Sequence, residues 1–528
     1  MSASGTFIQN VAGAWLMFDM TGSSTWVGLM VSSSLLPLFF LALAAGAFAD
    51  MFDRTKLMLI AQGIMGGSAA AMATLTYLDL ITPGILLGLG LLLGVGLALN
   101  IPAWQALVPD LVPRGLVASA VALQSAAFNA ARAVGPAVGG LILVAYGAAA
   151  GFGVNALTYL VVIAVLLVIG PQLAERAPER APMGSALSQG LRYARFTPEF
   201  RNLMGLVSIF AITSAVIQAV LPVHTVNLGG AEATYGVLLG AMGAGALIGA
   251  VLRPRNLLKM STSSVPYTIG AFGVSGIVLG VAPNVIVAFG AMLAVGFSWL
   301  LTLTTLNASA QLMTPSWIRG RAMSLYTLAF AGVLPIGSIL SGVVADGIGT
   351  TAALVVFSSS ALALGFIAPR FRVPNIAEIE APEFNVMKAP PHQDIEGLEG
   401  GPVIVLNIWQ VEESDLSEFT ALMNEIRLVR LTTGAYRWRL FRDIADPTRL
   451  TELFAVQSWE EHLAQHGRID DSSAALIARA RDFDRGDGPR SRHLIAIDVG
   501  APPDFAALIA AHAAMHETDG SIQVDDQP

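Results

Sequence analysis

The sequence contains no cysteine and few charged residues. With no cysteine among 528 residues, disulfide bonds, thiolate nucleophiles and cysteine-ligated metal sites are excluded. Charged residues make up 12% of the chain, against about 25% in an average soluble protein. No G-x-x-x-x-G-K-S/T loop occurs, so ATP is not expected to drive the protein directly. The scarcity of charge points to lipid as the solvent for much of the chain.

Long apolar tracts fill the first 370 residues. Hydrophobic residues make up 54% of the chain, and its mean hydropathy is +0.66. A membrane helix needs about 20 apolar residues, and polar punctuation divides this region into about twelve tracts near that length. We expect spans at 5–20, 24–49, 56–78, 82–103, 116–146, 151–170, 201–226, 233–252, 264–282, 285–312, 321–345 and 350–369.

Charge separates this region from the rest of the chain. Residues 1–370 contain 15 Lys and Arg and 10 Asp and Glu, whereas residues 371–528 contain 14 and 27. The second part has no apolar run long enough to cross a bilayer. Nucleic acid is not an expected partner, because binding phosphates requires a basic face.

Basic residues also predict the orientation of the spans. Fourteen of the fifteen in residues 1–370 lie in loops that follow even-numbered spans, and loops after odd-numbered spans contain none. Because cytoplasmic loops are enriched in Lys and Arg, both termini are expected in the cytoplasm. Arg132 is the exception, since it lies inside the fifth span.

The spans form two similar sets of six. The loop at 171–200 separates them, and "NIPAWQALVPDLVPRG" (100–115) resembles "NASAQLMTPSWIRGR" (307–321). A glycine- and proline-rich helix follows each segment. Parallel repeats of this kind occur in transporters that bind their substrate near the membrane midplane, between the two halves.

Three stretches resemble the major facilitator superfamily, in the transmembrane secretion effector branch that includes the enterobactin exporter. They are "GAFADMFDRTK" (46–56), "NIPAWQALVPDLVP" (100–113) and "ARAVGPAVGG" (131–140). The chain departs from the branch at Met51, usually Arg, and at Ala131, usually Gly. The resemblance implies an α-helical bundle of two six-helix halves, a proton-coupled antiporter in the bacterial inner membrane, and a cytoplasmic C-terminal domain of the type that some members carry.

Two of these stretches predict gating elements. The first contains Gly46, Asp50, Asp53, Arg54 and Lys56, whose charges are expected to latch the two halves together; the alternative is a loop that they merely solvate. The stretch at 131–140 contains four residues that allow close helix approach and bending, Gly135, Pro136, Gly139 and Gly140.

Arg132 is the central candidate for the transport site. A charge at the bilayer centre costs at least about 2.5–3.5 kcal/mol on insertion scales, so it is expected to face a cavity or a partner. Asn129 and Gln124 lie on the same side of the helix at helical spacing. We expect Arg132 to line the central cavity and to attract an anionic group of the substrate or to stabilise a carboxylate during proton exchange. The alternative is a structural residue that is hydrogen-bonded to helix ends.

The other expected cavity residues are polar or aromatic side chains within spans. They are Trp15, Asn100, Gln218, Asn307 and Gln311; hydrogen bonding between helices is the alternative role for the polar ones. For proton coupling, a buried carboxyl group with a raised pKa is the usual device, and the best candidates are Asp19 and then Asp50.

Residues 402–500 change to a soluble pattern, after a linker at 371–401. "PVIVLNIWQV" alternates as a strand, Asp415 is the expected N-cap of an amphipathic helix, and a hairpin, helices and a last strand follow. This β-α-β-β-α-β order is ferredoxin-like. It resembles small monooxygenase-type domains that dimerise through their sheets, so a dimer formed by this domain is possible. A short helix and tail are expected at 501–528.

His462 and His466 are spaced four residues apart, beside Glu460 and Glu461. This spacing can hold a metal, but without a third close ligand we expect solvated side chains and no metal or cofactor.

The expected function is export of a siderophore-like or amphipathic drug-like molecule by alternating access, coupled to protons, and not catalysis. The alternatives are an importer of the same fold and a membrane-anchored enzyme whose C-terminal domain performs the chemistry. The expected domains are the bundles at 1–170 and 201–370, joined by the loop at 171–200, and the soluble domain at 402–500.

Overall fold

The computed structural model describes most of the chain. The described residues are 2–41, 53–107, 112, 116–173, 183–251, 264–315, 318–371, 373, 402–486 and 490–496. They form two compact units. The membrane unit comprises residues 1–183, 199–314 and 319–379, and the C-terminal unit comprises 184–198, 315–318 and 380–528.

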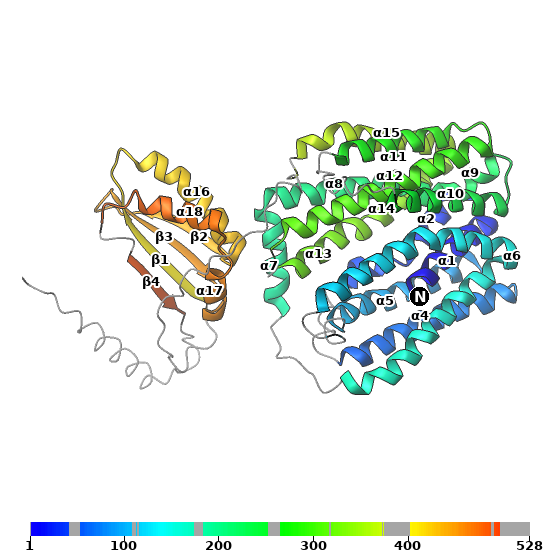
Figure 1. Cartoon of the computed structure of the whole chain (residues 1–528), viewed down its shortest axis with the longest axis horizontal. Coiled ribbons are helices and arrows are strands. Elements are labelled where there is room, and N and C mark those ends of the chain that lie inside the picture. Colours follow the sequence, from blue (N-terminus) through cyan, green and yellow to red (C-terminus); the bar gives the residue numbers. More distant parts are fainter. Residues whose placement is uncertain are drawn as a thin grey trace, which may run out of the picture. The chain divides into compact units, whose positions relative to one another are not determined.

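Helices alone build the described part of the membrane unit, and they run side by side (Figure 1). The first half contains α1 (Ser2–Thr21), α2 (Ser24–Ser33), α4 (Arg54–Tyr77), α5 (Pro83–Leu107) and α6 (Val117–Leu173). The second half contains α8 (Pro198–Ser214), α9 (Val216–Asn227), α10 (Glu232–Val251), α11 (Val265–Gly280), α12 (Val285–Met313), α13 (Arg319–Thr327), the π-helix η5 (Leu328–Gly332), α14 (Leu334–Ile348), α15 (Thr350–Ile367) and the 3-10 helix η6 (Ala368–Phe371).

Nine helical tracts in the described residues are long and apolar enough to cross a membrane. The longest tract, at 134–168, lies within α6, where Gly147 has a φ of 76°. A side chain is strained at such a φ, so glycine lets the chain reverse there. Many large apolar side chains are exposed on these helices, as expected where lipid surrounds the protein.

The polar residues of α1 face different environments. Asn155 Nδ2 on α6 donates a hydrogen bond to Gln9 Oε1 at 2.6 Å, and both side chains are buried. The Thr6 hydroxyl also lies 3.1 Å from the Tyr159 hydroxyl. Asn10 is exposed. Gln9 Nε2 donates to Met72 Sδ of α4 at 3.5 Å, so the buried polar groups of α1 find partners on α4 and α6, as a helix in lipid requires.

The C-terminal unit is a four-stranded antiparallel sheet with helices. Its elements are β1 (Val403–Gln410), α16 (Leu416–Thr433), β2 (Arg437–Arg442), β3 (Arg449–Val456), α17 (Trp459–His466), α18 (Asp471–Arg481) and β4 (Arg490–Ile495). The strand order is β2-β3-β1-β4, with Asn407 paired to Glu452 across β1 and β3. Alternate residues of β1 are buried: Trp409 packs with α16 and α18, which lie together over the sheet (Figure 1), whereas Val403 and Val405 belong to a cluster with Phe454 and Trp459.

Local capping explains where the helices of this unit begin. Ser458 and Asp470 accept hydrogen bonds from the backbone at the starts of α17 and α18. Asp415 does stand at the N-cap position of α16, but its side chain makes no capping hydrogen bond. Its carboxylate instead lies 3.4 Å from the Arg485 guanidinium, which draws it away from the backbone.

The segment expected as the central loop contains a helix, α7 (Met183–Phe196). Residues 184–198 belong to the C-terminal unit. Arg192 Nη1 donates a hydrogen bond to the Gly434 carbonyl oxygen, at the end of α16, at 2.8 Å. A segment that the sequence places between the two membrane halves therefore packs with the C-terminal unit.

Candidate transport site and the contact between the two halves

Helices α2 and α14 join the two halves of the membrane unit through small residues. A methyl group added at Gly342 of α14 would lie 2.5 Å from the Ser24 carbonyl oxygen, and one added at Gly28 would clash with the Ser338 carbonyl oxygen. The Ser32 hydroxyl lies 3.2 Å from the Pro335 carbonyl oxygen and donates to it. Glycine at these positions allows the two backbones to touch.

Asp346 connects the end of α14 to the start of α2. Its carboxylate accepts hydrogen bonds from the Ser23 hydroxyl at 2.5 Å, the Ser24 amide at 2.8 Å and the Thr25 amide at 3.0 Å. The first amide groups of a helix have no partner inside the helix, and an anion is favoured there. In the sequence, Asp346 directly follows the span expected at 321–345, and spacing alone does not identify its partners.

A second contact joins α6 to α10. A methyl group added at Gly140 would lie 2.5 Å from the Cα of Gly236 on α10. Nearby, the rings of Trp15 on α1 and Tyr235 on α10 stack with centroids 5.2 Å apart. Trp15, an expected cavity residue, is thus buried in a contact between the halves.

The glycine signature of α6 contacts two helices. Methyl groups at Gly135 and Gly139 would lie 2.6 Å from the Phe7 Cβ and 3.0 Å from the Ile8 Cα of α1, while Gly140 faces α10. Pro136 is half-buried between them. The predicted close approach of neighbouring helices is therefore seen on two sides of one segment.

The other gating residues lie partly outside the described residues. Gly46 and Asp50 are outside them, as is the side chain of Arg54. Asp53 Oδ1 accepts hydrogen bonds from the Thr55 and Lys56 amides at 2.8 and 3.1 Å and so caps α4, while Lys56 is exposed. This cap fixes where α4 starts. The expected role of the loop charges in holding the two halves together stays a prediction.

Arg132 and Asn129 lie on α6, but their side chains are outside the described residues. Gln124 and Gln218 are half-buried. The other amides bond to one another: Gln62 Nε2 donates to Asn100 Oδ1 at 2.9 Å, and Gln311 Nε2 donates to Asn307 Oδ1 at 2.6 Å. Asn100 therefore links two helices, α4 and α5.

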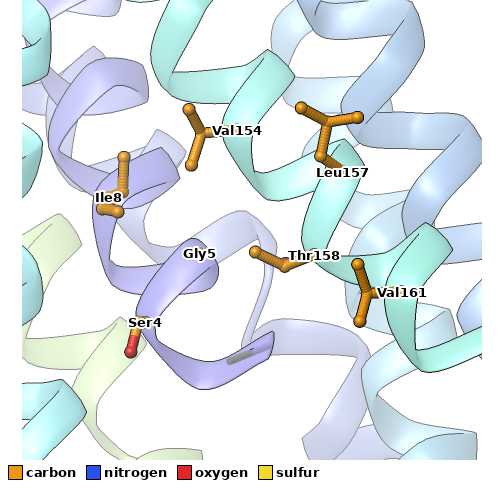
Figure 2. Close-up of a pocket in the computed structure, with 7 residues that line it drawn as sticks. All are labelled: Ser4, Gly5, Ile8, Val154, Leu157, Thr158 and Val161. Atoms are coloured by element: carbon orange, nitrogen blue, oxygen red, sulfur yellow. The ribbon is translucent and has the colours of Figure 1, made fainter. Parts of the chain in front are cut away.

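The cavity between α1 and α6 is apolar. It has a volume of about 370 Å³ and is lined by Ser4, Gly5, Ile8, Val154, Leu157, Thr158 and Val161 (Figure 2). None of the expected transport residues lines it. Leu157 and Val161 are exposed, so this cavity opens at the surface of the bundle.

A buried charge lies at the centre of the C-terminal unit. Glu452 accepts hydrogen bonds from Asn407 at 2.8 Å, Trp438 at 3.0 Å and Arg430 at 3.2 Å. The Arg430 guanidinium also lies 4.6 Å from the Phe454 ring centroid. These three donors together satisfy the carboxylate oxygens, as a buried ion requires. The network is therefore of the kind that stabilises a fold.

Three histidines meet at α17. His462 is 2% exposed, and its ring centroid lies 4.7 Å from that of His466 and 4.8 Å from that of His493. Burial, and then the nearby His466 and His493, lowers the pKa of His462 to about 3. No group of three or more His, Asp or Glu side chains suited to a metal lies within the described residues.

Proteins of known family resemble this chain over most of its length. Residues 1–500 match the family described as "Transmembrane secretion effector". The chain is 24% identical to a staphyloferrin A transporter of Staphylococcus aureus, over 69% of this chain and 91% of that protein. It is 29% identical to an enterobactin exporter of Escherichia coli (66% and 83%) and 26% identical to the multidrug efflux pump Tap of Mycolicibacterium fortuitum (71% and 95%).

Solved transporters share the fold. A D-xylose–proton symporter aligns with a TM-score of 0.57 and 15% identity, over 71% of this chain and 96% of its own. A bacterial homologue of the human lysosomal transporter Spinster, in an inward-facing state, aligns with a TM-score of 0.53 and 14% identity, over 70% and 94%.

Proposed function

Because the chain belongs to the transmembrane secretion effector family of the major facilitator superfamily, we propose that it is a proton-coupled exporter of a siderophore-like or amphipathic drug-like molecule. Its relatives include siderophore and multidrug efflux transporters. The absence of an ATP-binding loop leaves an ion gradient as the energy source.

The proposed architecture has twelve spans in the bacterial inner membrane, with both termini in the cytoplasm. The two arms of α6 on either side of Gly147, together with α1 and α11, bring the nine apolar tracts to twelve. The distribution of Lys and Arg supports the orientation. It assigns the turns before α2 and after α14 to the outer side of the membrane.

The contact between the halves is the observation that carries the proposal. Alternating access requires two halves that meet tightly on one side and can separate there. The contacts of Gly140 with Gly236 and of Gly342 with Ser24 bring backbones together without interlocking side chains. Such contacts hold the outer ends of the two halves together in this state. The halves can separate there without pulling interlocked side chains apart.

The substrate site is proposed on the inner side of these contacts, between the halves. Arg132 is proposed to bind an anionic group of the substrate, with Asn129, Gln124 and Gln218 nearby. Asp19 and Asp50 remain the proposed proton carriers. Asp19 is exposed near the end of α1, which suits exchange with water on the outer side.

Transport into inverted membrane vesicles tests this function. With a proton gradient, siderophore and hydrophobic drug probes are expected to accumulate in vesicles containing the full chain. Arg132→Ala is expected to lower the rate at least about tenfold, as for loss of one charge-assisted contact. Arg481→Ala, at an exposed position at the end of α18, is the matched control. The absence of gradient-driven accumulation for every probe contradicts export.

The C-terminal unit is proposed to be a ferredoxin-like accessory domain that forms a dimer through its sheet. The side chains of Phe441 on β2 and Leu494 on β4 are about half exposed. Both residues pair with residues whose side chains lie on the sheet face away from α16, so they lie on that face too. Cross-linking of Leu494→Cys tests the dimer, with Ile444→Cys in the hairpin turn as the control. Full transport by a chain ending at Arg370 would exclude the alternative in which this domain performs the chemistry.

A further inference from the structure

The start of α2 is completed by the other half of the protein. Ser23, its own N-cap, accepts a hydrogen bond from the Trp26 amide, which leaves the Ser24 and Thr25 amides without an acceptor in their own helix. Asp346 of α14 accepts both. When the halves separate at this end, these two amides lose their acceptor and the carboxylate loses its donors.

Among the described residues, no cationic side chain pairs with Asp346 in this contact. The described elements seen to pack against α2 or α14 are α1, α5, α8, α9, α15 and η5. Their titratable side chains are Asp19 on α1, His224 on α9, and Glu199 and Arg201 at the start of α8, away from its contact with α14 at Ile212. The start of α2, with its amides and the Ser23 hydroxyl, is therefore what stabilises the negative charge.

His224 is occupied by other partners. Its Nε2 lies 3.0 Å from the Leu279 carbonyl oxygen and donates to it, and its Nδ1 lies 3.2 Å from the Thr350 hydroxyl. A neutral imidazole satisfies both contacts. Asp19 makes no hydrogen bond or ion pair with another described residue. Asp346 is thus the group at this contact whose ionisation changes the bonding between the halves.

We propose that Asp346 is a positioning residue that latches the outer end of the transporter in its ionised form and releases it when protonated. A protonated carboxyl group loses the charge that the helix start favours and turns one acceptor oxygen into a donor. Asp346 is an exposed residue, so water reaches it. Acid on the outer side then favours the state that is open to the outside, because the proton binds that state more tightly.

The proposal rests on the proposed function only for which side of the membrane is the outer one. Its test therefore measures the distance between α2 and α14 and needs no substrate. Since the chain has no cysteine, spin labels are attached at Trp26→Cys and Val343→Cys, which are 37% and 52% exposed. Pulsed EPR in lipid nanodiscs then gives the distance distribution at pH 8 and pH 5.

In the otherwise unchanged chain, the population with α2 and α14 apart is expected to grow between pH 8 and pH 5. Asp346→Asn is expected to raise this population about three- to tenfold at pH 8, the size expected for losing an anion at a helix start, and to abolish its response to pH. Asp346→Glu keeps the carboxylate and is expected to restore the response. Asp79→Asn, at an exposed carboxylate in the turn between α4 and α5, is the matched control and is expected to behave as the unchanged chain.

Two results would overturn the proposal: an unchanged distance distribution in Asp346→Asn at both pH values, or the same loss of pH response in Asp79→Asn. If Asp346→Asn does not fold, Ser23→Ala replaces it, since this change removes one donor and leaves the carboxylate in place. A smaller rise in the separated population is then expected, and no rise contradicts the latch. If no probe accumulates in the vesicle assay while the pH response of the distance is intact, export is overturned but the proposed role of Asp346 is not.

Discussion

Gly140 of α6 and Gly236 of α10 meet backbone to backbone, although they belong to different halves of the membrane unit. A methyl group added at Gly140 would lie 2.5 Å from the Cα of Gly236 and 3.0 Å from its carbonyl oxygen. No real side chain fits that space. The glycine signature of the fifth span therefore specifies how closely the two halves approach.

Gly140→Ala is expected to destabilise the closed arrangement by about 1–3 kcal/mol, because overpacking forces the two backbones apart. Thermal unfolding in detergent and vesicle transport measure the effect. Gly153→Ala, on the same helix with nothing within 4 Å of the added methyl group, is the control. Equal behaviour of the two variants would show that the contact does not limit the approach of the halves.

The hydrogen bond between Gln9 and Asn155 predicts a non-additive pair. Asn155→Leu leaves the buried Gln9 Oε1 without its donor, so we expect a loss of about 0.5–2 kcal/mol, the range for such bonds in membranes. The double change to Leu at positions 9 and 155 is expected to cost less than the two single changes together. Thermal unfolding of the four chains gives the coupling, and strict additivity contradicts it.

The buried carboxylate of Glu452 predicts a large effect in the C-terminal unit. Glu452→Leu leaves the Arg430 charge and the Trp438 and Asn407 donors unpaired, so the unit is expected to lose about 3–5 kcal/mol of stability. Hydrogen exchange of β1 and β3 in the full chain measures it. Glu418→Leu removes an exposed ion pair with Arg479 and is expected to change exchange by less than about 1 kcal/mol.

The histidine cluster predicts how the stability of the C-terminal unit varies with pH. The folded-state pKa of His462 is about 3, below its ordinary value of 6.5, so the unfolded chain binds a proton first as the pH falls. His462 therefore lowers the free energy of unfolding as pH drops from 6.5 towards 3, by at most about 1.4 kcal/mol per pH unit.

Unfolding of the C-terminal unit between pH 7 and pH 5, followed by hydrogen exchange, measures this slope. His462→Leu is expected to flatten it, since the neutral side chain fits the same buried site without a proton to bind. His512→Leu, in the tail, is the control and is expected to leave the slope unchanged. A steep slope that survives in His462→Leu would assign the pH dependence to other groups.

Much of the fold follows from composition and local pattern. The apolar tracts predicted the membrane helices, and the strand alternation from Pro402 predicted β1 with its buried face. Both signals depend on residues close together in the chain. The helix α7 was missed, because residues 171–200 are polar and carry no tract long enough to span a membrane.

The site was less predictable than the fold. The glycines of the fifth span were found by their motif, and the structure shows which helix each one faces. Asn100 and Asn307 were expected either to line the transport cavity or to form hydrogen bonds between helices. Asn100 accepts a hydrogen bond from Gln62 on a neighbouring helix, and Asn307 accepts one from Gln311 a turn along its own helix. An amide in lipid takes whichever partner the packing brings, and no spacing rule specifies that choice.

By itself, the sequence determined that membrane helices fill the first 370 residues and that the C-terminal part differs from them, since run length and charge distribution suffice to choose between lipid and water; three motifs added the resemblance to a transporter family. Only the tertiary structure decided that Asp346 closes the start of α2, from 322 positions away. Contacts of that kind depend on where whole helices pack, and packing joins residues whose separation along the chain carries no signal.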